Sequence, residues 1–447
     1  MLRTLTYVFT AVIFVTILTA GANAQTCPGS PGCLDTTFGT SGMVSTVPPA
    51  SNTSSPGGFT REMVFQSDGK IVILSEAHDA ANTFSAALTR LTRDGSMDAS
   101  FGSDGFAYIT WGSPSECLPL ALAVQTINGE DRFVVSGIKG CGSGTGSLMV
   151  QRYTSSGGLD TTFGTSGATT VKVGTSVQMS TAIQADRKIL VGNGGNPMVR
   201  LNANGTPDTG FGPGGVSKSS PGISIKAMKA LPDGKILAAG YVSAGKTNNF
   251  GVVRYTSDGR LDPTFGSRGL VSIDFAGKND LAGDLTVDPS GKILVCGEAT
   301  FTEGTTVGRG YDAVLVRLNS NGTLDSSFGS GGKTAPLNVG DLHDFFGSVS
   351  VQSDGKIILT GESKRAGNTA NSDVLTARYN SNGTLDTSYS GIGWNLTDFY
   401  GANDDGVRGR LQFDPMCDCE KFVIVGRADT EQSSTTARYI VGLRFSL

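Results

Sequence analysis

The sequence predicts an all-β protein, a seven-bladed β-propeller of four-stranded blades. Gly is abundant, with 63 of 447 residues, and charged residues make up only 17%, which is typical of turn-rich β proteins. An arginine-led unit with Gly at +5, Asp at +8, Phe at +11 and Gly at +12 and +15 recurs along the chain. An apolar run that begins with Lys or Arg recurs seven times. Such long-period repeats, with four strand-like pieces in each, favour a propeller.

The first 24 residues have the features of a secretory signal peptide. Arg3 provides a basic start, residues 7–18 are apolar, and residues 22–24 (Ala-Asn-Ala) fit the small-residue cleavage pattern. We therefore expect an exported protein, in the periplasm, at the cell surface or outside the cell, with no membrane span in the mature chain. Residues 25–33 are expected to form a short leader, and residues 34–447 a single propeller domain.

The four strands of a repeat are illustrated by residues 227–275. An alternating run, 227–232, leads into Asp-Gly-Lys, which is a hairpin signal between two strands. The apolar run 235–240 follows, then a run that ends at the unit arginine, 249–255. The fourth run, 270–275, follows the last Gly of the unit and completes the expected blade.

The last repeat has no fourth strand of its own. Its first three strands are expected at residues 407–413, 421–427 and 437–445. We expect residues 43–47 to supply the missing strand, because an open sheet edge invites wrong pairing. The N-terminal strand would then complete the C-terminal blade, and Asp35 would pair with Arg444 as the Asp and Arg of each internal unit do.

The repeated unit is interpreted as structural. Its Arg and Asp, eight residues apart across a Gly turn, suit a charged hydrogen bond that braces a loop. Its Phe suits an apolar peg between blades. Many copies of one arrangement indicate structure, since a catalytic site needs only one.

These motifs resemble the delta-60 repeat, a bacterial propeller repeat of largely unknown function. The resemblance rests on the DGKIL turn, the arginine strand, and NSNGTLDSSFG followed by Gly-Gly at residues 319–332, and it covers about residues 34–447. The strand order resembles that of NHL-type propellers, which places the alternating strand of each repeat innermost. The resemblance implies a fold and no activity.

Seven cysteines in an exported chain indicate disulfides with one thiol left over. We expect Cys27 and Cys33 to bond to Cys417 and Cys419, in an order that stays open, which would staple the two chain ends. A local Cys27–Cys33 bond and a Cys417–Cys419 bond are the alternatives.

The other three cysteines belong to single repeats. Cys117 begins the first strand of the second repeat and Cys141 lies in a loop on the same face, so we expect them to pair. Cys296 lies inside an apolar run and is expected to be a buried free thiol.

One acidic feature is a candidate ligand site. Pairs of carboxylates, with one histidine, stand where the innermost strands of three consecutive blades begin: Asp280, Asp284, Asp341, His343, Asp344, Asp404 and Asp405. In the expected strand order they surround one mouth of the channel. A ring of carboxylates suits Ca²⁺ or a cationic ligand, and solvated loop charge is the alternative. No other cofactor is expected.

The favoured function is a non-enzymatic exported scaffold that binds a protein or carbohydrate ligand through loops on one face or the channel mouth. No G-x-S-x-G motif is present and the chain has two histidines, so no catalytic residue is assigned. The alternatives are a propeller hydrolase or lyase acting on a polysaccharide or lactone, and a purely structural cell-surface repeat protein. The formal net charge of −4 argues against a nucleic-acid partner, and we expect a monomer.

Overall fold

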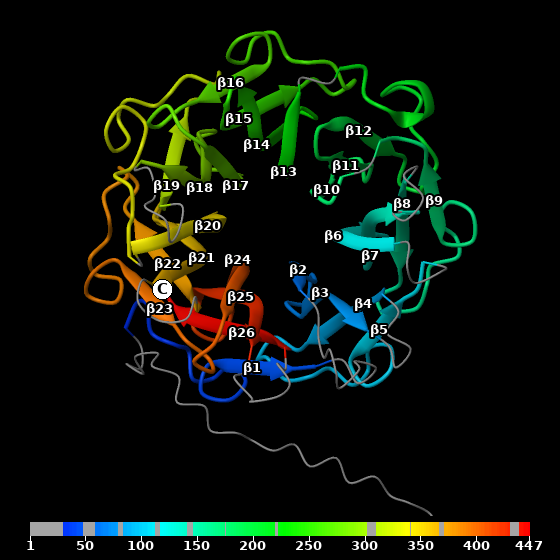
Figure 1. Cartoon of the computed structure of the whole chain (residues 1–447). Coiled ribbons are helices and arrows are strands. Elements are labelled where there is room, and N and C mark those ends of the chain that lie inside the picture. Colours follow the sequence, from blue (N-terminus) through cyan, green and yellow to red (C-terminus); the bar gives the residue numbers. More distant parts are fainter. Residues whose placement is uncertain are drawn as a thin grey trace, which may run out of the picture.

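The computed structural model describes residues 30–47, 59–78, 84–111, 117–140, 146–174, 176–219, 222–301, 310–339, 341–365, 371–429 and 438–447. In these ranges the regular structure is β-strand, apart from one 3-10 turn, η3 (Pro213–Gly215). No helix within them has the length and apolarity needed to cross a membrane. Figure 1 shows the sheets arranged around a common centre, as in a propeller.

The strands are antiparallel within each repeat. The first two repeats contain β2 (Thr60–Phe65), β3 (Ile71–His78), β4 (Phe84–Leu91), β5 (Phe106–Ile109), β6 (Cys117–Ile127), β7 (Glu130–Lys139), β8 (Ser147–Tyr153) and β9 (Ala168–Val171). The next two contain β10 (Met179–Ile183), β11 (Ile189–Asn193), β12 (Asn196–Leu201), β13 (Ile223–Ala230), β14 (Ile236–Ala244), β15 (Thr247–Tyr255) and β16 (Leu270–Ile273).

The C-terminal half continues the pattern. It contains β17 (Asp280–Val287), β18 (Ile293–Thr300), β19 (Tyr311–Leu318), β20 (Asp341–Val351), β21 (Ile357–Arg365), β22 (Ser372–Tyr379) and β23 (Trp394–Thr397). The last repeat contains β24 (Asp404–Asp414), β25 (Cys419–Asp429) and β26 (Arg438–Ser446). The strands nearest the centre in Figure 1 include β2, β6, β10, β13, β17, β20 and β24.

The prediction of seven four-stranded blades is wrong. In the described ranges the strands form six sheets, and only four of these have four strands. Strands β10–β12 form a three-stranded sheet, and β17–β23 form one sheet of seven strands in which β19 and β20 pair in parallel through Tyr311 and His343.

Proline accounts for both departures. After β12, Pro213 begins the η3 turn, and a single bridge from Val199 to Val216 stands where a fourth strand was expected. After β19, the bridges Val316–Lys333 and Ala313–Leu337 lie on either side of Pro336. Proline has no N–H to give to a sheet ladder, so neither segment forms a continuous strand.

The prediction that the N-terminal strand completes the C-terminal sheet is confirmed. Strand β1 (Met43–Thr46) pairs antiparallel with β26, from Met43 opposite Leu443 to Thr46 opposite Ile440. The order in this sheet is β1-β26-β25-β24. In Figure 1 the blue β1 lies beside the red β26, so the two ends of the described chain share one sheet.

The arginine-led unit has the structural role expected of it. In each copy the arginine Nε lies 2.7–2.9 Å from the aspartate Oδ2, in Arg90–Asp98, Arg152–Asp160, Arg200–Asp208, Arg254–Asp262, Arg317–Asp325, Arg378–Asp386 and Arg444–Asp35. These pairs brace the turn between a third strand and the chain that follows it.

The unit also joins one repeat to the next. The guanidinium of Arg254 lies 4.7 Å from the ring centroid of Phe265 and donates to the carbonyl of Ser320 in the following repeat. Phe265 is fully buried, and a Cβ at Gly322 would lie 3.0 Å from its ring. Gly322 has φ of +90°, so the close approach and the backbone both favour glycine.

The hydrophobic core lies between neighbouring sheets. One cluster joins Phe250 and Val252 of β15 to Leu285 of β17 and to Val314 and Val316 of β19, all of them buried. The apolar runs that recur in the sequence supply strands such as β14, β18 and β21, which are buried over most of their length. Each repeat is therefore stabilised by packing against its neighbours.

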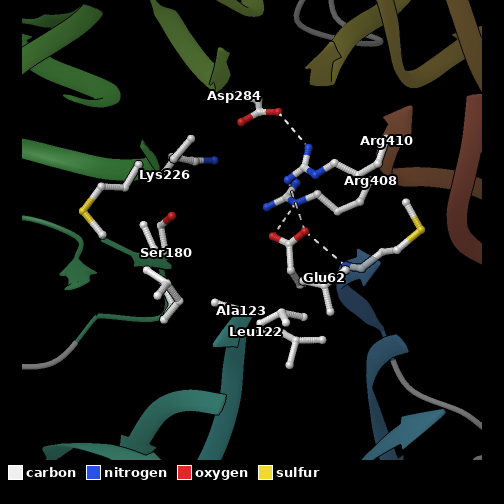
Figure 2. A pocket seen from close by; sticks show the side chains of 16 residues that line it. Glu62, Leu122, Ala123, Ser180, Lys226, Asp284, Arg408 and Arg410 are labelled. Atoms are coloured by element: carbon white, nitrogen blue, oxygen red, sulfur yellow. Dashed lines mark hydrogen bonds and ion pairs between the residues drawn. The ribbon is translucent and has the colours of Figure 1, made fainter. Parts of the chain in front are cut away.

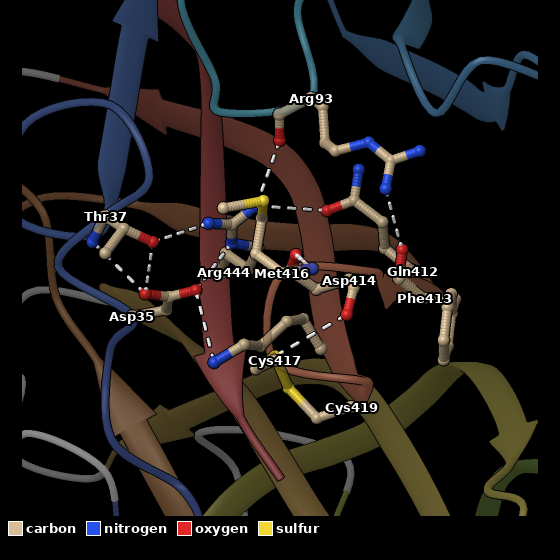
Figure 3. The surroundings of a disulfide bond; sticks show 11 residues. Asp35, Thr37, Arg93, Gln412, Phe413, Asp414, Met416, Cys417, Cys419 and Arg444 are labelled. Atoms are coloured by element: carbon tan, nitrogen blue, oxygen red, sulfur yellow. Dashed lines mark hydrogen bonds and ion pairs between the residues drawn. A yellow bond between two sulfur atoms is a disulfide. The ribbon is translucent and has the colours of Figure 1, made fainter.

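The predicted bonds from Cys417 and Cys419 to Cys27 and Cys33 are wrong, since Cys417 and Cys419 bond to each other (Figure 3). The reason is the length of the β24–β25 hairpin. Strand β26 ends at Ser446, which pairs with Lys421 and whose N–H donates to the Cys33 carbonyl. The hairpin tip extends beyond that point and contains both Cys417 and Cys419.

The remaining cysteines have different outcomes. Cys33 is also disulfide-bonded. Cys27 and Cys141 lie outside the described residues, so the Cys117–Cys141 bond stays a prediction. Cys296 is a buried free cysteine, as predicted, and burial raises the pKa of its thiol.

Candidate functional site

Three of the predicted site residues hold loops in place. Asp280, Asp344 and Asp404 are fully buried at the start of β17, β20 and β24. One oxygen of each accepts a backbone N–H from five residues earlier: Phe275 at 3.0 Å, Val339 at 2.8 Å and Phe399 at 2.6 Å. Each aspartate therefore fixes the loop that leads into an innermost strand.

Burial changes the titration of two of these aspartates. Burial, with the charge of Asp274 adding to it, raises the pKa of Asp280 to about 6. Burial raises the pKa of Asp404 to about 8, and the nearby carboxylates Asp398, Asp373 and Asp405 contribute in the same direction. Both groups pack where a negative charge is unfavourable.

The other predicted aspartates do not form one site with these three, and each has a different environment. Asp284 accepts hydrogen bonds from Ser348 Oγ and the Val349 N–H, both at 3.2 Å, and faces the centre of the propeller. Asp405 forms an ion pair with Arg427 at 2.8 Å. Asp341 begins β20, and its side chain lies outside the described part of the structure.

His343 is brought to two glutamates that the sequence did not indicate. Its Nε2 lies 2.6 Å from Glu298 on β18, and its Nδ1 lies 3.8 Å from Glu362 on β21. Burial raises the pKa of Glu362 to about 9, and the hydrogen bond and charge of Asp405 add to the shift. Glu298 and Glu362 each stand six residues after the lysine that begins an apolar run. This common position at the end of the second strand is the sequence signal that could have indicated them.

The centre of the propeller contains two adjoining cavities, of about 290 and about 590 Å³. Figure 2 shows the first, with side chains that converge from different inner strands. Glu62 comes from β2, Lys226 from β13, Asp284 from β17, and Arg408 and Arg410 from β24. Asp284 and Arg410 line both cavities.

Both arginines of the centre contact carboxylates. Arg408 Nε lies 2.9 Å from Glu62, and its Nη1 donates to the Gly347 carbonyl at 3.3 Å. Arg410 has longer contacts, at 3.4 Å to Glu62 and 3.4 Å to Asp284, and its side chain is 34% exposed. Arg410 is therefore the more accessible guanidinium.

Two lysines add positive charge. Lys226 lines the first cavity and Lys229 the second, where Lys229 Nζ donates to Thr286 Oγ1 at 3.2 Å. Burial lowers the pKa of Lys229, and the charge of Arg410 adds to this while that of Asp284 opposes it. Neither lysine has an ion pair within 4.0 Å among the described residues.

The charges of the two cavities do not balance. Four cations line them, against the three carboxylates Glu62, Asp284 and Asp288. Asp288 is occupied by its own turn, because it accepts hydrogen bonds from Ser290 and Lys292. The centre is thus positively charged in a chain whose net charge is −4.

Bulges in the inner strands explain why this site was not predicted. The ladder skips one residue between Ile225 and Ala227 in β13, and the same irregularity lies between Ala282 and Asp284 and between Gly406 and Arg408. A bulge re-aims the side chains around it. Strict alternation along the sequence therefore assigns the wrong residues to the centre.

Five segments of the chain match a family model described as "Domain of unknown function (DUF5122) beta-propeller": residues 66–101, 184–211, 231–265, 288–328 and 352–389. This chain is a β-propeller protein. The family model matches five repeats, so it does not support the predicted seven blades. Its description also does not confirm the predicted delta-60 repeat family. No curated protein matches the sequence.

Solved structures are similar at low identity. An ancestral GH74 enzyme is 10% identical with a TM-score of 0.45, and the match covers 90% of this chain and 51% of the enzyme. The α-L-arabinofuranosidase Arb93A from Fusarium graminearum is 10% identical, with a TM-score of 0.41 and coverages of 90% and 97%. The NanB sialidase from Streptococcus pneumoniae is 10% identical, with a TM-score of 0.43 and coverages of 90% and 70%. Such likeness says nothing about the activity of this chain.

Proposed function

We propose that this propeller is an exported, non-enzymatic binding protein that takes a small anionic ligand at its centre. The observation that carries the proposal is the pair of lysines, Lys226 and Lys229, which face the two cavities without an ion pair among the described residues. An anion bound between the two ammonium groups would be attracted by both and would neutralise the excess positive charge of the cavities.

Arg410 supplies the orienting contact. Its guanidinium donates to Ser348 Oγ at 3.0 Å, and its contacts to Glu62 and Asp284 are longer, at 3.4 Å each, so a ligand carboxylate or phosphate can replace these two contacts. A guanidinium binds such groups through two parallel hydrogen bonds, which fixes their orientation. Arg408, held by Glu62 and the Gly347 carbonyl, keeps the centre positive without moving.

The apolar part of the cavities limits the size of the ligand. Leu122 and Met228 line the first cavity, and Val349 and Leu411 line the second. With a volume of about 590 Å³ for the larger cavity, the ligand is of metabolite size.

The test is binding of defined anions to the purified mature chain. Calorimetry and thermal unfolding would be measured with citrate, inorganic phosphate and galacturonate, and with spermidine and glucose as cationic and neutral comparisons. The proposal expects an anion to raise Tm and the double variant Lys226→Gln/Lys229→Gln to weaken its binding by about tenfold or more. Lys246→Gln, at the exposed tip of the β14–β15 hairpin, is the matched control and leaves binding unchanged.

Two results would overturn the proposal. One is the absence of any Tm shift with millimolar anion. The other is a shift that the double variant and the Lys246 control retain equally, which would place the anion elsewhere.

A hydrolase acting on a polysaccharide or lactone is the second candidate, and one observation favours it. The pKa of Glu362 is raised to about 9, chiefly by burial, so this carboxyl can carry a proton at neutral pH beside His343. A protonated carboxyl is the form that a general acid needs. Turnover on a glycan and lactone panel that is lost in Glu362→Gln would support this function, and no turnover on the panel would remove it.

A further inference from the structure

Lys229 differs from the lysines that begin the apolar runs in the partner of its amino group. Six of those lysines lie 2.9–3.5 Å from the aspartate of an arginine-led unit: Lys70–Asp98, Lys188–Asp208, Lys235–Asp262, Lys292–Asp325, Lys356–Asp386 and Lys421–Asp35. Lys229 Nζ instead contacts a hydroxyl, Thr286 Oγ1, at 3.2 Å. Among the described residues it has no ion pair within 4.0 Å, so no contacting carboxylate holds its proton.

The surroundings of Lys229 favour the neutral amine. Lys229 is half-buried on β13 and lines the cavity of about 590 Å³, whose wall also contains Val349 and Leu411. Burial lowers the pKa of Lys229, and the charge of Arg410 adds to this while that of Asp284 opposes it. A desolvated lysine beside another cation is a setting in which proteins use the neutral amine as a nucleophile toward carbonyl groups.

The same cavity contains a group that suits a carboxylate. Arg410 lines the cavity together with Lys229, and its Nη1 donates to Ser348 Oγ at 3.0 Å. Its contacts to Glu62 and Asp284 are longer, at 3.4 Å each (Figure 2). A guanidinium and an amine in one cavity suit a ligand that has both a carboxylate and a carbonyl group.

We propose that Lys229 forms an imine with an oxo acid, a carboxylate that also contains a ketone or an aldehyde. The proposal rests on the proposed function, because the carboxylate of the oxo acid is the anion that Arg410 orients. The neutral amine attacks the carbonyl carbon and gives a carbinolamine, in which the carbonyl oxygen has become a hydroxyl. This hydroxyl leaves as water when the C=N bond forms.

The protons and the charge of this step balance. One ammonium group and one carbonyl group give one protonated imine and one water, so no proton is released overall. The positive charge therefore stays beside the bound carboxylate. No oxidant or reductant takes part, and the reverse reaction with water restores the lysine and the oxo acid.

Two neighbours of Lys229 can assist the proton transfers. Asp284 lines the same cavity, and its charge acts on Lys229. Its carboxylate can take the ammonium proton and return it to the carbinolamine hydroxyl. Thr286 Oγ1 accepts a hydrogen bond from Lys229 Nζ and so orients the amine. Lys226 lines the other cavity, which makes Lys229 the expected point of attachment.

The experiment traps the imine in the purified protein with cyanoborohydride, which reduces it to a stable secondary amine. The oxo acids are pyruvate and glyoxylate, and the matched ligands are lactate and glycolate, which have a hydroxyl in place of the carbonyl. Peptide mass mapping locates the adduct. Because Arg410 holds the carbonyl beside the amine, we expect Lys229 to be labelled by about tenfold or more over the exposed Lys246. Lactate and glycolate should raise Tm and leave no adduct.

Two variants assign the adduct to its residue. Lys229→Gln keeps a side chain that can donate to Thr286 and is expected to lose the adduct. Lys246→Gln is the matched control and keeps it. The Tm of each variant without ligand shows whether the fold is retained, and labelling of the natural chain needs no variant.

The imine and the anion site can fail separately. If pyruvate and lactate raise Tm but neither oxo acid labels Lys229, the imine is overturned and anion binding stands. Equal labelling of Lys229 and Lys246 also overturns the imine, because it is the ordinary reactivity of an exposed lysine. If none of the four acids raises Tm or labels Lys229, the imine and the proposed function are both overturned.

Discussion

Arg444 Nε donates a hydrogen bond to Asp35 Oδ2 at 2.8 Å, although 409 positions separate the two residues. Arg444 also donates to Thr37 Oγ1 at 2.8 Å, to the Arg93 carbonyl at 3.0 Å and to Gln412 at 3.2 Å (Figure 3). Both partners of the ion pair are buried, with 3% and 7% of their surface exposed. One ion pair thus connects the first described segment, the last strand and a neighbouring repeat.

The substitution Asp35→Ala is expected to destabilise the whole propeller. It leaves the Arg444 guanidinium buried without its carboxylate, and removing one partner of a buried pair costs about 3–5 kcal/mol. Urea unfolding of the purified protein would measure the change in unfolding free energy. Asp258→Ala is the control, since Asp258 and its partner Arg260 are 40% and 63% exposed and such pairs contribute at most about 1 kcal/mol. An equal loss of unfolding free energy in the two variants would show that the Asp35–Arg444 pair stabilises the protein no more than an exposed ion pair does.

Phe265→Ala is expected to cost about 3–5 kcal/mol, because it removes a fully buried ring from between two repeats. Denaturant unfolding is again the measurement. Phe413→Ala provides the comparison, since the Phe413 side chain is 56% exposed and its removal should be nearly neutral. A loss below that of the control would contradict the role of Phe265 as an inter-repeat peg.

Asp280 gives the stability a pH dependence of definite sign. Burial raises its pKa to about 6 in the folded chain, above the value of about 3.9 in an unfolded chain. The folded state therefore binds the proton more tightly, and the stabilisation is complete below about pH 4 and is lost as pH rises through about 6. In Asp280→Asn, unfolding free energies between pH 4 and 7 should lose this contribution, and the variant should be more stable than the natural chain at pH 7. A pH profile parallel to that of the natural chain would refute the assignment.

The Cys417–Cys419 bond is expected to add little stability. It joins residues only two positions apart, and closing so short a loop contributes about 1–2 kcal/mol in the chain-entropy model. A bond from this hairpin to the N-terminal leader would close a far longer loop and contribute roughly 6 kcal/mol in the same model. The paired variant Cys417→Ser/Cys419→Ser should therefore unfold only slightly earlier in urea. A large loss would mean that the hairpin tip has a further partner.

The sequence was sufficient to predict the ion pair of each repeat and the pairing of the two chain ends. The unit arginines and aspartates pair as expected, and the absent fourth strand of the last repeat led to the pairing of β1 with β26. Both depend on spacing alone, which the sequence displays directly. The predicted number of four-stranded blades was wrong because Pro213 and Pro336 interrupt two fourth strands. The prediction relied on the features that all repeats share and gave no weight to these single residues.

The candidate sites were harder to predict because they combine residues from several repeats. Lys226 reaches the centre at a bulge in β13, where period-two alternation no longer holds. Lys229 looks like one more strand residue until the structure brings it to Thr286 and Arg410. Spacing within one repeat contains no information about such contacts between repeats.

Because the two ends of the described chain share one sheet, that sheet can be completed only after the whole chain has been synthesised. Strand β1 (Met43–Thr46) leaves the ribosome long before β26 (Arg438–Ser446) exists, and its edge has no partner in the meantime. A newly synthesised chain must keep that edge away from the strands of other chains until the C-terminal residues have been made. Any truncation near the C-terminus would thus open the ring at both of its ends at once.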